Sequence, residues 1–529
     1  MAAVRWNWGS GSPGNDALKN NRPRGSFSRL PRFFSTQPGS PPGREECSEA
    51  ASDIIIIFRK VHPRVEFHKG ALAAPFSFWH VLTTEHFTDK PFLAMRQQTP
   101  RVPASPSRRR FLQAGAITSL AGLAPLGKAL SNSAADSIAE AFSALKPLGS
   151  RVHPITADEY RGRLQHAQKL MAELEPKYDA LFVAPGTSLY YFTGIRWGMS
   201  ERLLALVLPR TGDPIIVVPA FEEGRMREKL QFPAEVRIWQ EDQSPTKIAA
   251  AALADRGMQT GKIGVEETAP FTFYDHLRAA APGLECISAD PLTIACRGRK
   301  SEHELELMRL ACEATFDVFR AVFASVKEGM SQEDIGKLVA GGFSKMDLHG
   351  GALVLLGASA ALPHGTIKPQ KLKEGEVILI DGGCAVEGYQ SDVTRTGVLG
   401  KPPEKVARIF EIVRKAQDAA LDAARAGRLS GTVDDAARKV VTDAGFGPDY
   451  KTFTHRLGHG IGLDGHEHPY LVRGSKTVLE SGMTFSNEPG IYLVGEFGLR
   501  CEDDMVITAD GSAQLLTQGF APSLEKPLG

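Results

Sequence analysis

The segment 377–396 reads Val377-Ile-Leu-Ile-Asp381-Gly-Gly-Cys-Ala-Val-Glu-Gly-Tyr-Gln-Ser-Asp392-Val-Thr-Arg-Thr396. Its four leading apolar residues end in an acid, which predicts a buried strand whose carboxyl end carries Asp381 into a cavity. The glycine pair 382–383 is then expected to turn the chain. Because β-branched residues follow Asp392, a second strand is predicted there, and the two carboxylates can meet on adjacent strands. The alternative for either acid is a turn or a helix cap, where Asp is common.

Histidines interspersed with glycines form a second segment, Thr454-His455-Arg-Leu-Gly-His459-Gly-Ile-Gly-Leu-Asp-Gly-His466-Glu-His468-Pro469. The spacing of His455 and His459 suits a zinc pair on a helix, but each glycine costs a helix about 1 kcal/mol against Ala. The segment is therefore predicted to be extended, with its backbone close to a bulky group such as a metal centre. A single buried histidine is more often a core residue than a ligand. Several histidines in so short a segment favour a site.

Two further carboxylates follow this segment. Glu488 precedes Pro489-Gly490, a turn signal. Glu502 alternates with Arg500, so on a strand the two share one face, and Arg500 is the predicted partner that orients Glu502 from behind. Four carboxylates and a neutral imidazole carry about four negative charges, which balance two divalent cations. The set therefore favours two metals over one.

These segments resemble the pita-bread metallopeptidases, the family of aminopeptidase P, prolidase, methionine aminopeptidase and creatinase. The motif His-x-x-Gly-His-Gly-Ile-Gly-Leu-x-x-His-Glu carries the resemblance. The resemblance implies five metal ligands, namely Asp381, Asp392, His459, Glu488 and Glu502. It also implies three substrate and transition-state histidines, namely His364, His455 and His466. Gly465 departs from the family, which usually carries an aliphatic residue there. Creatinase lacks the full ligand set, so the complete set argues against a metal-free hydrolase.

The resemblance implies a mechanism of two-metal hydrolysis. Two cations about 3.5–4 Å apart hold a bridging water and lower its pKa. Asp392 and Glu502 are expected to bridge the cations, Asp381 to chelate one, and His459 with Glu488 to hold the other. Such a carboxylate-rich set suits Mn²⁺, with Co²⁺ or Zn²⁺ as alternatives.

The same reading assigns the proton transfers. Glu488 is expected to accept the proton of the attacking water, and His466 to donate to the developing oxyanion. His364 and His455 are expected to position the scissile group. The predicted activity is hydrolysis of Xaa-Pro bonds, in which the proline nitrogen offers no N–H for recognition. Shape and metal contact must therefore do most of the selection.

Substrate length stays open between an Xaa-Pro dipeptidase and an Xaa-Pro aminopeptidase. Arg473, in the loop before Glu488, is a candidate clamp for a substrate carboxylate. The alternative for Arg473 is a solvated surface residue, as most arginines are. Two other functions remain open: a non-catalytic peptide-binding protein on the same fold, and hydrolysis of another amide or C–N bond. The expected partner is a proline-containing peptide, and a homodimer or homotetramer is expected.

An α/β domain is predicted before the catalytic part, over residues 150–297. Helical and strand-like stretches alternate there, with a helix at 157–174. Strands are predicted at 180–183, 203–208, 214–218 and 262–265, and a second helix at 222–230. The domain resembles the N-terminal domain of creatinase, prolidase and aminopeptidase P, especially at Ser188-Leu-Tyr-Tyr-Phe-Thr-Gly194. Methionine aminopeptidase lacks this domain.

The catalytic domain is predicted over residues 300–520, and the fold class is α/β (α+β). Ser301-Glu-His-Glu304 is a capping box that opens a long helix, and Ser331 caps a second one. Two further helices are predicted at 404–426 and 432–444.

An export signal is predicted before both domains. Ser107-Arg108-Arg109-Arg110-Phe111-Leu112-Gln113 resembles the twin-arginine motif, followed by an apolar stretch and a small-residue region ending near Ala135. The signal is assigned to residues 95–135, and the expected location is periplasmic or secreted. Residues 1–94 lack a periodic pattern and are interpreted as disordered or as a mis-assigned upstream extension. The apolar stretch is too short for a stable membrane anchor.

Charge and cysteine content exclude other classes. The 529 residues carry a formal net charge of +1, and no basic face stands out, which excludes nucleic-acid binding. Six cysteines show neither paired zinc spacing nor a dense disulfide framework, and they are interpreted as core residues.

Overall fold

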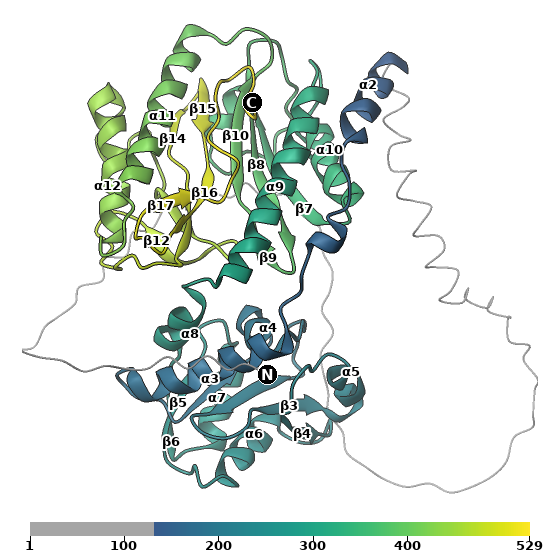
Figure 1. Cartoon of the computed structure of the whole chain (residues 1–529), viewed down its shortest axis with the longest axis vertical. Helices are drawn as coiled ribbons and strands as arrows, with labels where there is room; N and C mark the ends of the chain where they lie inside the picture. The colour runs from purple at the N-terminus through teal and green to yellow at the C-terminus, as the bar shows by residue number, and fades with distance from the viewer. Residues whose placement is uncertain (1–131) are drawn as a thin grey trace, which may run out of the picture. The chain divides into compact units, whose positions relative to one another are not determined.

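The computed structural model describes residues 132–529, drawn as coloured ribbon in Figure 1. The predicted upstream extension, Cys47 and the twin-arginine motif lie outside the described residues. Among the helices of residues 132–529, none combines the length and the apolar character that crossing a membrane requires. The described cysteines are all unpaired, and four of the five are buried, in agreement with the core interpretation.

A six-stranded sheet forms the centre of the N-terminal domain, in the order β4-β3-β2-β1-β5-β6. Its strands are β1 Ala180–Val183, β2 Ala205–Pro209, β3 Ile215–Pro219, β4 Glu235–Trp239, β5 Gly261–Val265 and β6 Leu284–Ser288. β2 pairs antiparallel with β1 and β3, whereas β3/β4, β1/β5 and β5/β6 are parallel. The predicted strands are all present, within two residues of their expected starts.

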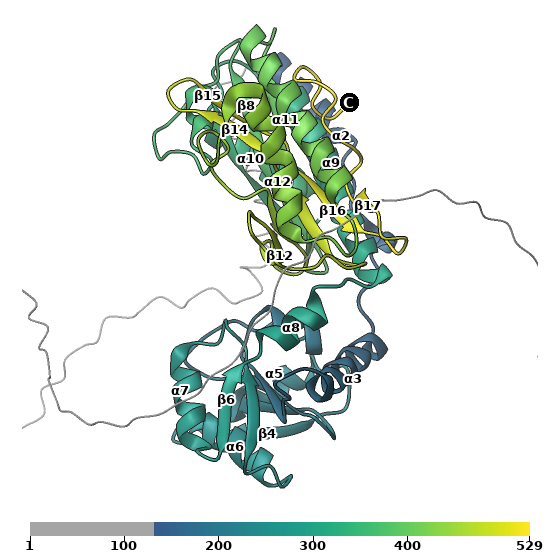
Figure 2. The ribbon, with the colours of Figure 1, turned by 90° about the vertical axis from the view of Figure 1, so that its left-hand side faces the viewer.

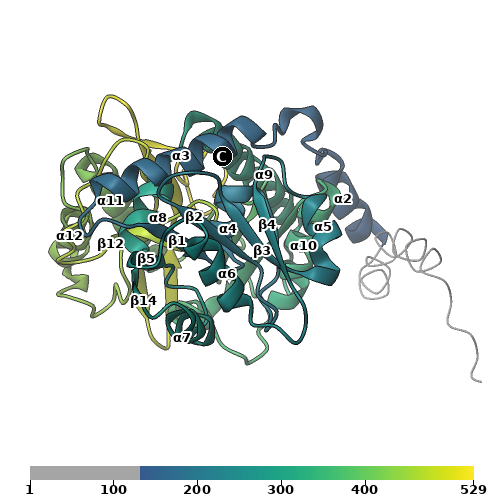
Figure 3. The same ribbon diagram turned by 90° about the horizontal axis from the view of Figure 1, so that it is seen from below.

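Helices cover both faces of this sheet, as Figures 2 and 3 show. One face carries α3 Ala157–Glu173, α4 Thr187–Thr193 and α8 Asp290–Arg297, and the other carries α6 Pro245–Ala254 and α7 Phe271–Ala280. A short helix, α5 Glu223–Arg227, follows β3. Leu181 and Val183 of β1 enter the core under α3, while Ala180 and Phe182 enter the core under α6 and α7. Because both faces are covered, the strand is apolar at every position.

The catalytic domain contains two antiparallel sheets and a hairpin. The first sheet has the order β10-β8-β7, with β9 paired to β8; its strands are β7 His349–Leu356, β8 Val377–Val386, β9 Tyr389–Gln390 and β10 Val393–Val398. The second has the order β12-β11-β13-β16-β17; its strands are β11 Gly458–Gly460, β12 Glu467–Leu471, β13 Thr484–Asn487, β16 Asp503–Ile507 and β17 Ala513–Leu515. The hairpin is β14 Gly490–Leu493 with β15 Phe497–Arg500. A bridge between Thr394 and Glu502 joins the two sheets.

Four long helices enclose these sheets (Figure 1). They are α9 Glu302–Ser325, α10 Gln332–Lys345, α11 Glu404–Ala423 and α12 Ser430–Val441. Ile378 and Ile380 of β8 pack into the core that contains α9, whereas Val377 and Leu379 pack into the core that contains α11. Alternate side chains of one apolar strand thus serve two cores, which explains its continuous apolar run.

The predicted helix starts are confirmed by their caps. Ser301 accepts a hydrogen bond from the Glu304 N–H and forms a complete capping box, and Ser331 does the same with Asp334. The helices predicted at 404–426 and 432–444 end three residues earlier than expected. A further helix, α2 Asn132–Ser143, places Ile138 in the same core as α9, and Lys345 donates to the Phe142 carbonyl at 2.5 Å.

The predicted turn at Gly382-Gly383 is wrong. β8 continues through both glycines to Val386, and the chain turns at Glu387-Gly388, whose φ angles are 50° and 90°. The glycines are needed for close backbone approach instead. A Cβ on Gly383 would lie 2.0 Å from the Ser391 carbonyl oxygen. Because glycine has no side chain, the backbone of the neighbouring segment can approach β8 closely at this point.

Candidate metal and catalytic site

Five predicted ligands converge from five different strands or strand ends. Asp381 lies within β8, Asp392 directly before β10, His459 on β11, Glu488 directly after β13 and Glu502 directly before β16. Their side chains form overlapping groups whose donor atoms lie within 4.8 Å of one another, namely Asp381–Asp392–Glu502, His459–Glu488–Glu502 and Asp392–His459–His466. Segments more than a hundred residues apart in the chain thus supply one cluster.

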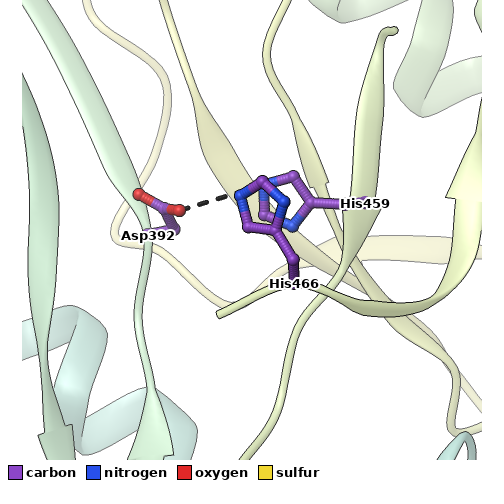
Figure 4. Close-up of side chains that lie close together, drawn as sticks. All are labelled: Asp392, His459 and His466. Carbon is purple, nitrogen blue, oxygen red and sulfur yellow. Dashed lines mark ion pairs between the residues drawn. The ribbon is translucent and has the colours of Figure 1, made fainter. Parts of the chain in front are cut away.

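The His459 imidazole faces two of the carboxylates. Its Nε2 lies 3.3 Å from Glu488 Oε1 and 3.9 Å from Asp392 Oδ2, the second contact being dashed in Figure 4. Its Nδ1 lies 3.1 Å from the Gly460 carbonyl, which can only accept, so Nδ1 carries the proton. Burial, assisted by His466, lowers the pKa of His459 to about 4. A neutral imidazole therefore presents its Nε2 lone pair to carboxylates, an arrangement that a cation between them satisfies.

The four carboxylates are crowded; Glu502 is buried, and the other three are partly buried. Burial raises the pKa of Asp392 well above its ordinary value, and Asp381 adds to the effect. Burial likewise raises the pKa of Glu502, with Asp392 as the next cause. For Glu488, burial outweighs the opposing charge of Arg500 and raises the pKa to about 8. Carboxylates that repel one another at close range fit divalent cations, which are held by such oxygens.

Arg500 supports the cluster from behind. Its guanidinium donates to Asp381 Oδ2, to the Tyr492 hydroxyl at 2.8 Å and to Thr394 Oγ1 at 3.2 Å. Thr394 in turn donates to Glu502 Oε2 at 2.6 Å. The predicted partner of Arg500 was Glu502, but the ion pair forms with Asp381. The reason is that β15 ends at Arg500 and Glu502 lies outside both neighbouring strands, so strand alternation does not relate the two side chains.

The three predicted histidines lie around the ligand cluster. His455 Nδ1 lies 2.8 Å from the Arg456 carbonyl, which leaves Nε2 to accept from the Tyr492 hydroxyl at 2.7 Å. Burial, with Arg500 as the next cause, lowers the pKa of His455 to about 3. The exposed His466 stacks on the ring of His459, with centroids 3.6 Å apart and planes at 16° (Figure 4).

His364 follows the short helix η4 Gly357–Ala361 in an exposed loop. The carbonyl of its neighbour Pro363 lies 3.5 Å from an Arg500 nitrogen. A charge on His364 also contributes to the lowered pKa values of His455 and His466. These relations place the His364 loop at the rim of the cluster.

Arg473 forms its contacts with Asp449 and Tyr450. It forms an ion pair with Asp449 at 2.6 Å, and 40% of its side chain is exposed. Its guanidinium also lies over the ring of Tyr450, 5.3 Å from the ring centroid. These contacts match the alternative of a surface arginine, and the substrate clamp stays a prediction. Gly465 lies in the bend before β12, where a Cβ would have only the Gln390 amide as a near neighbour, at 3.4 Å. A Cβ is therefore accommodated at this position without a backbone clash.

Two supporting residues, Tyr492 and Ser486, were missed from the sequence, and a third, Asp504, was given no role although it alternates with Arg500 and Glu502. Tyr492 joins His455 to Arg500, and no local pattern marks it. Ser486 accepts from the His459 N–H at 3.1 Å and donates to Glu488 Oε1 at 3.3 Å. The two-residue spacing of Ser486 and Glu488 on a predicted strand was a usable signal. Asp504 accepts from the Asp392 N–H at 3.0 Å.

Oxygen ligands clustered around a neutral imidazole define the chemistry of a metal-dependent hydrolase. Residues 306–509 match the family described as "Metallopeptidase family M24", and residues 163–298 match "Creatinase/Prolidase N-terminal domain". The chain belongs to metallopeptidase family M24. This confirms the predicted fold class and family.

Similar proteins agree with this assignment. A probable dipeptidase PepE of Mycobacterium tuberculosis is 34% identical over 378 residues, which cover 70% of this chain and 96% of that protein. An Xaa-Pro dipeptidase of Lactobacillus delbrueckii subsp. lactis is 33% identical, covering 63% of this chain and 91% of that protein. The solved structure of a prolidase from Thermococcus sibiricus is 31% identical, with a TM-score of 0.62, and covers 68% of this chain and 97% of that one.

Proposed function

We propose that this metallopeptidase hydrolyses Xaa-Pro bonds in short peptides, with two divalent cations held by the five clustered ligands. The observation that carries the proposal is the convergence of His459, Glu488 and Glu502 with Asp381 and Asp392 within donor distance of one another. The relatives named as Xaa-Pro dipeptidase and prolidase support this substrate class. Their names also favour a dipeptidase over an aminopeptidase.

The residues of the chain divide the remaining tasks. Bound cations would polarise the scissile carbonyl and lower the pKa of a coordinated water. Glu488 accepts the proton of the attacking water, a role open to a carboxylate that lies 3.3 Å from His459 Nε2 within the ligand cluster. His466 donates to the oxygen that becomes negative in the transition state. His455, kept neutral by burial and held by Tyr492, positions the scissile group together with His364.

Mn²⁺ is the proposed native metal. The ligand set holds four carboxylates and one imidazole and no thiolate, which suits Mn²⁺ better than softer ions. Loss of activity after exchange of Mn²⁺ for Zn²⁺ or Co²⁺ would support this choice. Equal activity with all three metals would contradict a preference of the site for Mn²⁺. We also propose export by the twin-arginine route and a homodimer or homotetramer, which follow from the sequence expectations alone.

A substrate panel tests the activity. Residues 136–529 are assayed against Xaa-Pro dipeptides, Xaa-Pro-Yaa tripeptides and matched Xaa-Ala dipeptides, with metal content measured on the same preparation. Cleavage of Xaa-Pro dipeptides, weak cleavage of tripeptides and about two metals per chain are expected. Preferential cleavage of tripeptides would make the enzyme an aminopeptidase. Binding without cleavage, or cleavage only of another C–N bond, would overturn the proposal.

A further inference from the structure

His466 lies in the segment 461–467, which runs from the end of β11 to the first residue of β12 and is called the bend below. Its side chain is exposed, and its ring rests on the ring of His459. The backbone on the near side of the bend is held by Gln390, whose N–H donates to Gly462 O at 2.8 Å and whose side-chain amide donates to Leu463 O at 2.9 Å. The position of the His466 imidazole therefore depends on what fixes the rest of this bend.

Two acidic residues flank His466, and two basic side chains form ion pairs with them. Arg297 donates to Asp464 Oδ2 at 2.5 Å and to Glu467 Oε2 at 2.7 Å. Lys300 donates to Glu467 Oε1 at 2.5 Å. We call these four residues, Arg297, Lys300, Asp464 and Glu467, the Arg297 cluster. Its carboxylates lie two residues before His466 and one residue after it, so both sides of the histidine are anchored.

Burial shields the two ion pairs of Glu467, with Arg297 and with Lys300, from water. Only 14% of the Arg297 side chain, 2% of the Lys300 side chain and 10% of the Glu467 side chain are exposed. Water and salt screen such pairs less than exposed ones. The cluster also packs against the bend itself, since a Cβ on Gly462 would lie 2.6 Å from Glu467 Oε1 and 2.7 Å from Lys300 Cε. The backbone of the bend at Gly462 is thus in close contact with the side chains of Lys300 and Glu467.

The two basic residues of the Arg297 cluster lie outside the catalytic sheets. Arg297 is the last residue of α8 in the N-terminal domain, and Lys300 lies directly before the cap of α9. Thr187, near the start of α4, donates to Asp464 Oδ1 at 2.5 Å. Arg297 also donates to Ser188 Oγ at 3.1 Å. The N-terminal domain therefore contacts the catalytic domain at the bend that carries His466.

We propose that Arg297 is a positioning residue. It fixes the 461–467 bend, and the bend keeps the His466 ring stacked on the ring of His459. The proposal rests on the proposed role of His466 in hydrolysis. It assigns a catalytic contribution to the N-terminal domain, which reaches the reaction only through the bend. Loss of Arg297 removes one partner from each of two carboxylates, because its guanidinium bridges Asp464 and Glu467. Lys300 still holds Glu467 and Thr187 still holds Asp464, so the bend is loosened rather than freed.

A double-mutant cycle tests this coupling. Arg297→Ala is expected to lower kcat about 10- to 100-fold, as loss of outer partners of a metal site does, with KM and metal content close to wild type. In the His466→Ala background, the same change is expected to lower kcat less than twofold. Equal fold losses in both backgrounds would overturn the proposal, because Arg297 would then act independently of His466. Arg299→Ala is the matched control, since Arg299 is exposed in the same linker and pairs with Glu480.

Backbone exchange supplies a second readout that needs no substrate. In the metal-free protein, Arg297→Ala is expected to speed hydrogen exchange of a peptide covering 461–467, while peptides of β1 and β8 keep wild-type rates. Arg297→Lys should restore part of the protection, since one of the two carboxylates regains a partner. Unchanged exchange in 461–467 would overturn the proposal. Absence of Xaa-Pro cleavage by the wild type, with faster exchange in the variant, would overturn the proposed function and retain the positioning role.

If Arg297→Ala does not fold, Asp464→Asn replaces it in both experiments. The Asp464 side chain is 40% exposed, so its change is milder, and it removes the same anchor two residues before His466. Faster exchange and a kcat loss that vanishes in the His466→Ala background support the proposal. A kcat equal to wild type overturns it.

Discussion

The imidazole rings of His459 and His466 lie parallel, with their centroids 3.6 Å apart. His459 directs its Nε2 at the carboxylates, and the stack places His466 at the edge of the same group. The geometry is compatible with two roles for His466, a donor to the oxyanion or a sixth ligand. The two roles differ in what the metal content does when the ring is removed.

His466→Ala separates these roles. We expect kcat to fall about 10²- to 10³-fold with metal content unchanged, because an oxyanion donor is lost while the five ligands remain. Metal content is measured by atomic spectroscopy on the assayed protein. Loss of one metal in the variant would instead assign His466 to the ligand set.

Asp392→Asn tests the ligand cluster itself. A neutral amide cannot supply the charge of a bridging carboxylate, so turnover should be abolished and metal occupancy should fall. Asp443→Asn is the matched control, because Asp443 is exposed and forms an ion pair with Lys439 on the protein surface. Full activity with two bound metals in Asp392→Asn would remove this residue from the site.

Thr394→Val tests the support of Glu502. The hydroxyl donates to Glu502 Oε2 at 2.6 Å, so its loss should weaken metal affinity about 10- to 100-fold. Thr396→Val is the control, since Thr396 is equally buried on β10 but donates to the Arg500 backbone carbonyl. Both variants should lose stability, and only Thr394→Val should lose metal affinity, measured by competition with a chelating dye. Equal affinities in the two variants would contradict this role.

Metal removal should make stability depend on pH. The pKa of Glu488 rises from its ordinary value of 4.5 to about 8 in the folded, metal-free site. A group whose folded pKa is raised stabilises the fold fully below its unfolded pKa, and this contribution is lost as pH rises through the folded pKa. The metal-free protein should therefore lose melting temperature between about pH 4.5 and 8.

Thermal melts with and without chelator, at pH 6 and pH 9, check this prediction. The drop in Tm caused by the chelator should be larger at pH 9, where the carboxylates are ionised and lack their cations. Asp392 and Glu502, whose pKa values are also raised by burial, act in the same direction. A drop in Tm that is larger at pH 6 than at pH 9 would show that repulsion between the ionised carboxylates does not destabilise the metal-free protein.

Export is tested at the twin-arginine motif. Replacing Arg108 and Arg109 with Lys should leave precursor in the cytoplasm, because the export machinery reads the arginine pair. We propose that the signal is cleaved close to Ala135, where its small-residue region ends. A chain that starts at residue 136 should fold and cleave Xaa-Pro peptides as well as a longer one, since it keeps the buried Ile138. Peptides from residues 1–94 on the native mature protein would contradict this reading.

Local sequence patterns predicted most elements and the types of residue at the site. The apolar run ending in Asp381, the glycines around His459 and the caps at Ser301 and Ser331 each express a local preference of the backbone or of a short strand. The family motif added the five ligands and the three histidines. These inferences need only neighbours in the sequence, or a known pattern of them.

Only the tertiary structure decided which side chains support one another. Arg500 pairs with Asp381, which is 119 residues away, because the β14–β15 hairpin lies against β8. Strand alternation pointed to Glu502 instead, and it failed because Glu502 lies between two strands of different sheets. The Arg297 cluster depends on contact between two domains, which no local pattern encodes. Close contacts between distant segments are fixed by packing and by the need to pair buried charges, and these exist only once the chain is folded.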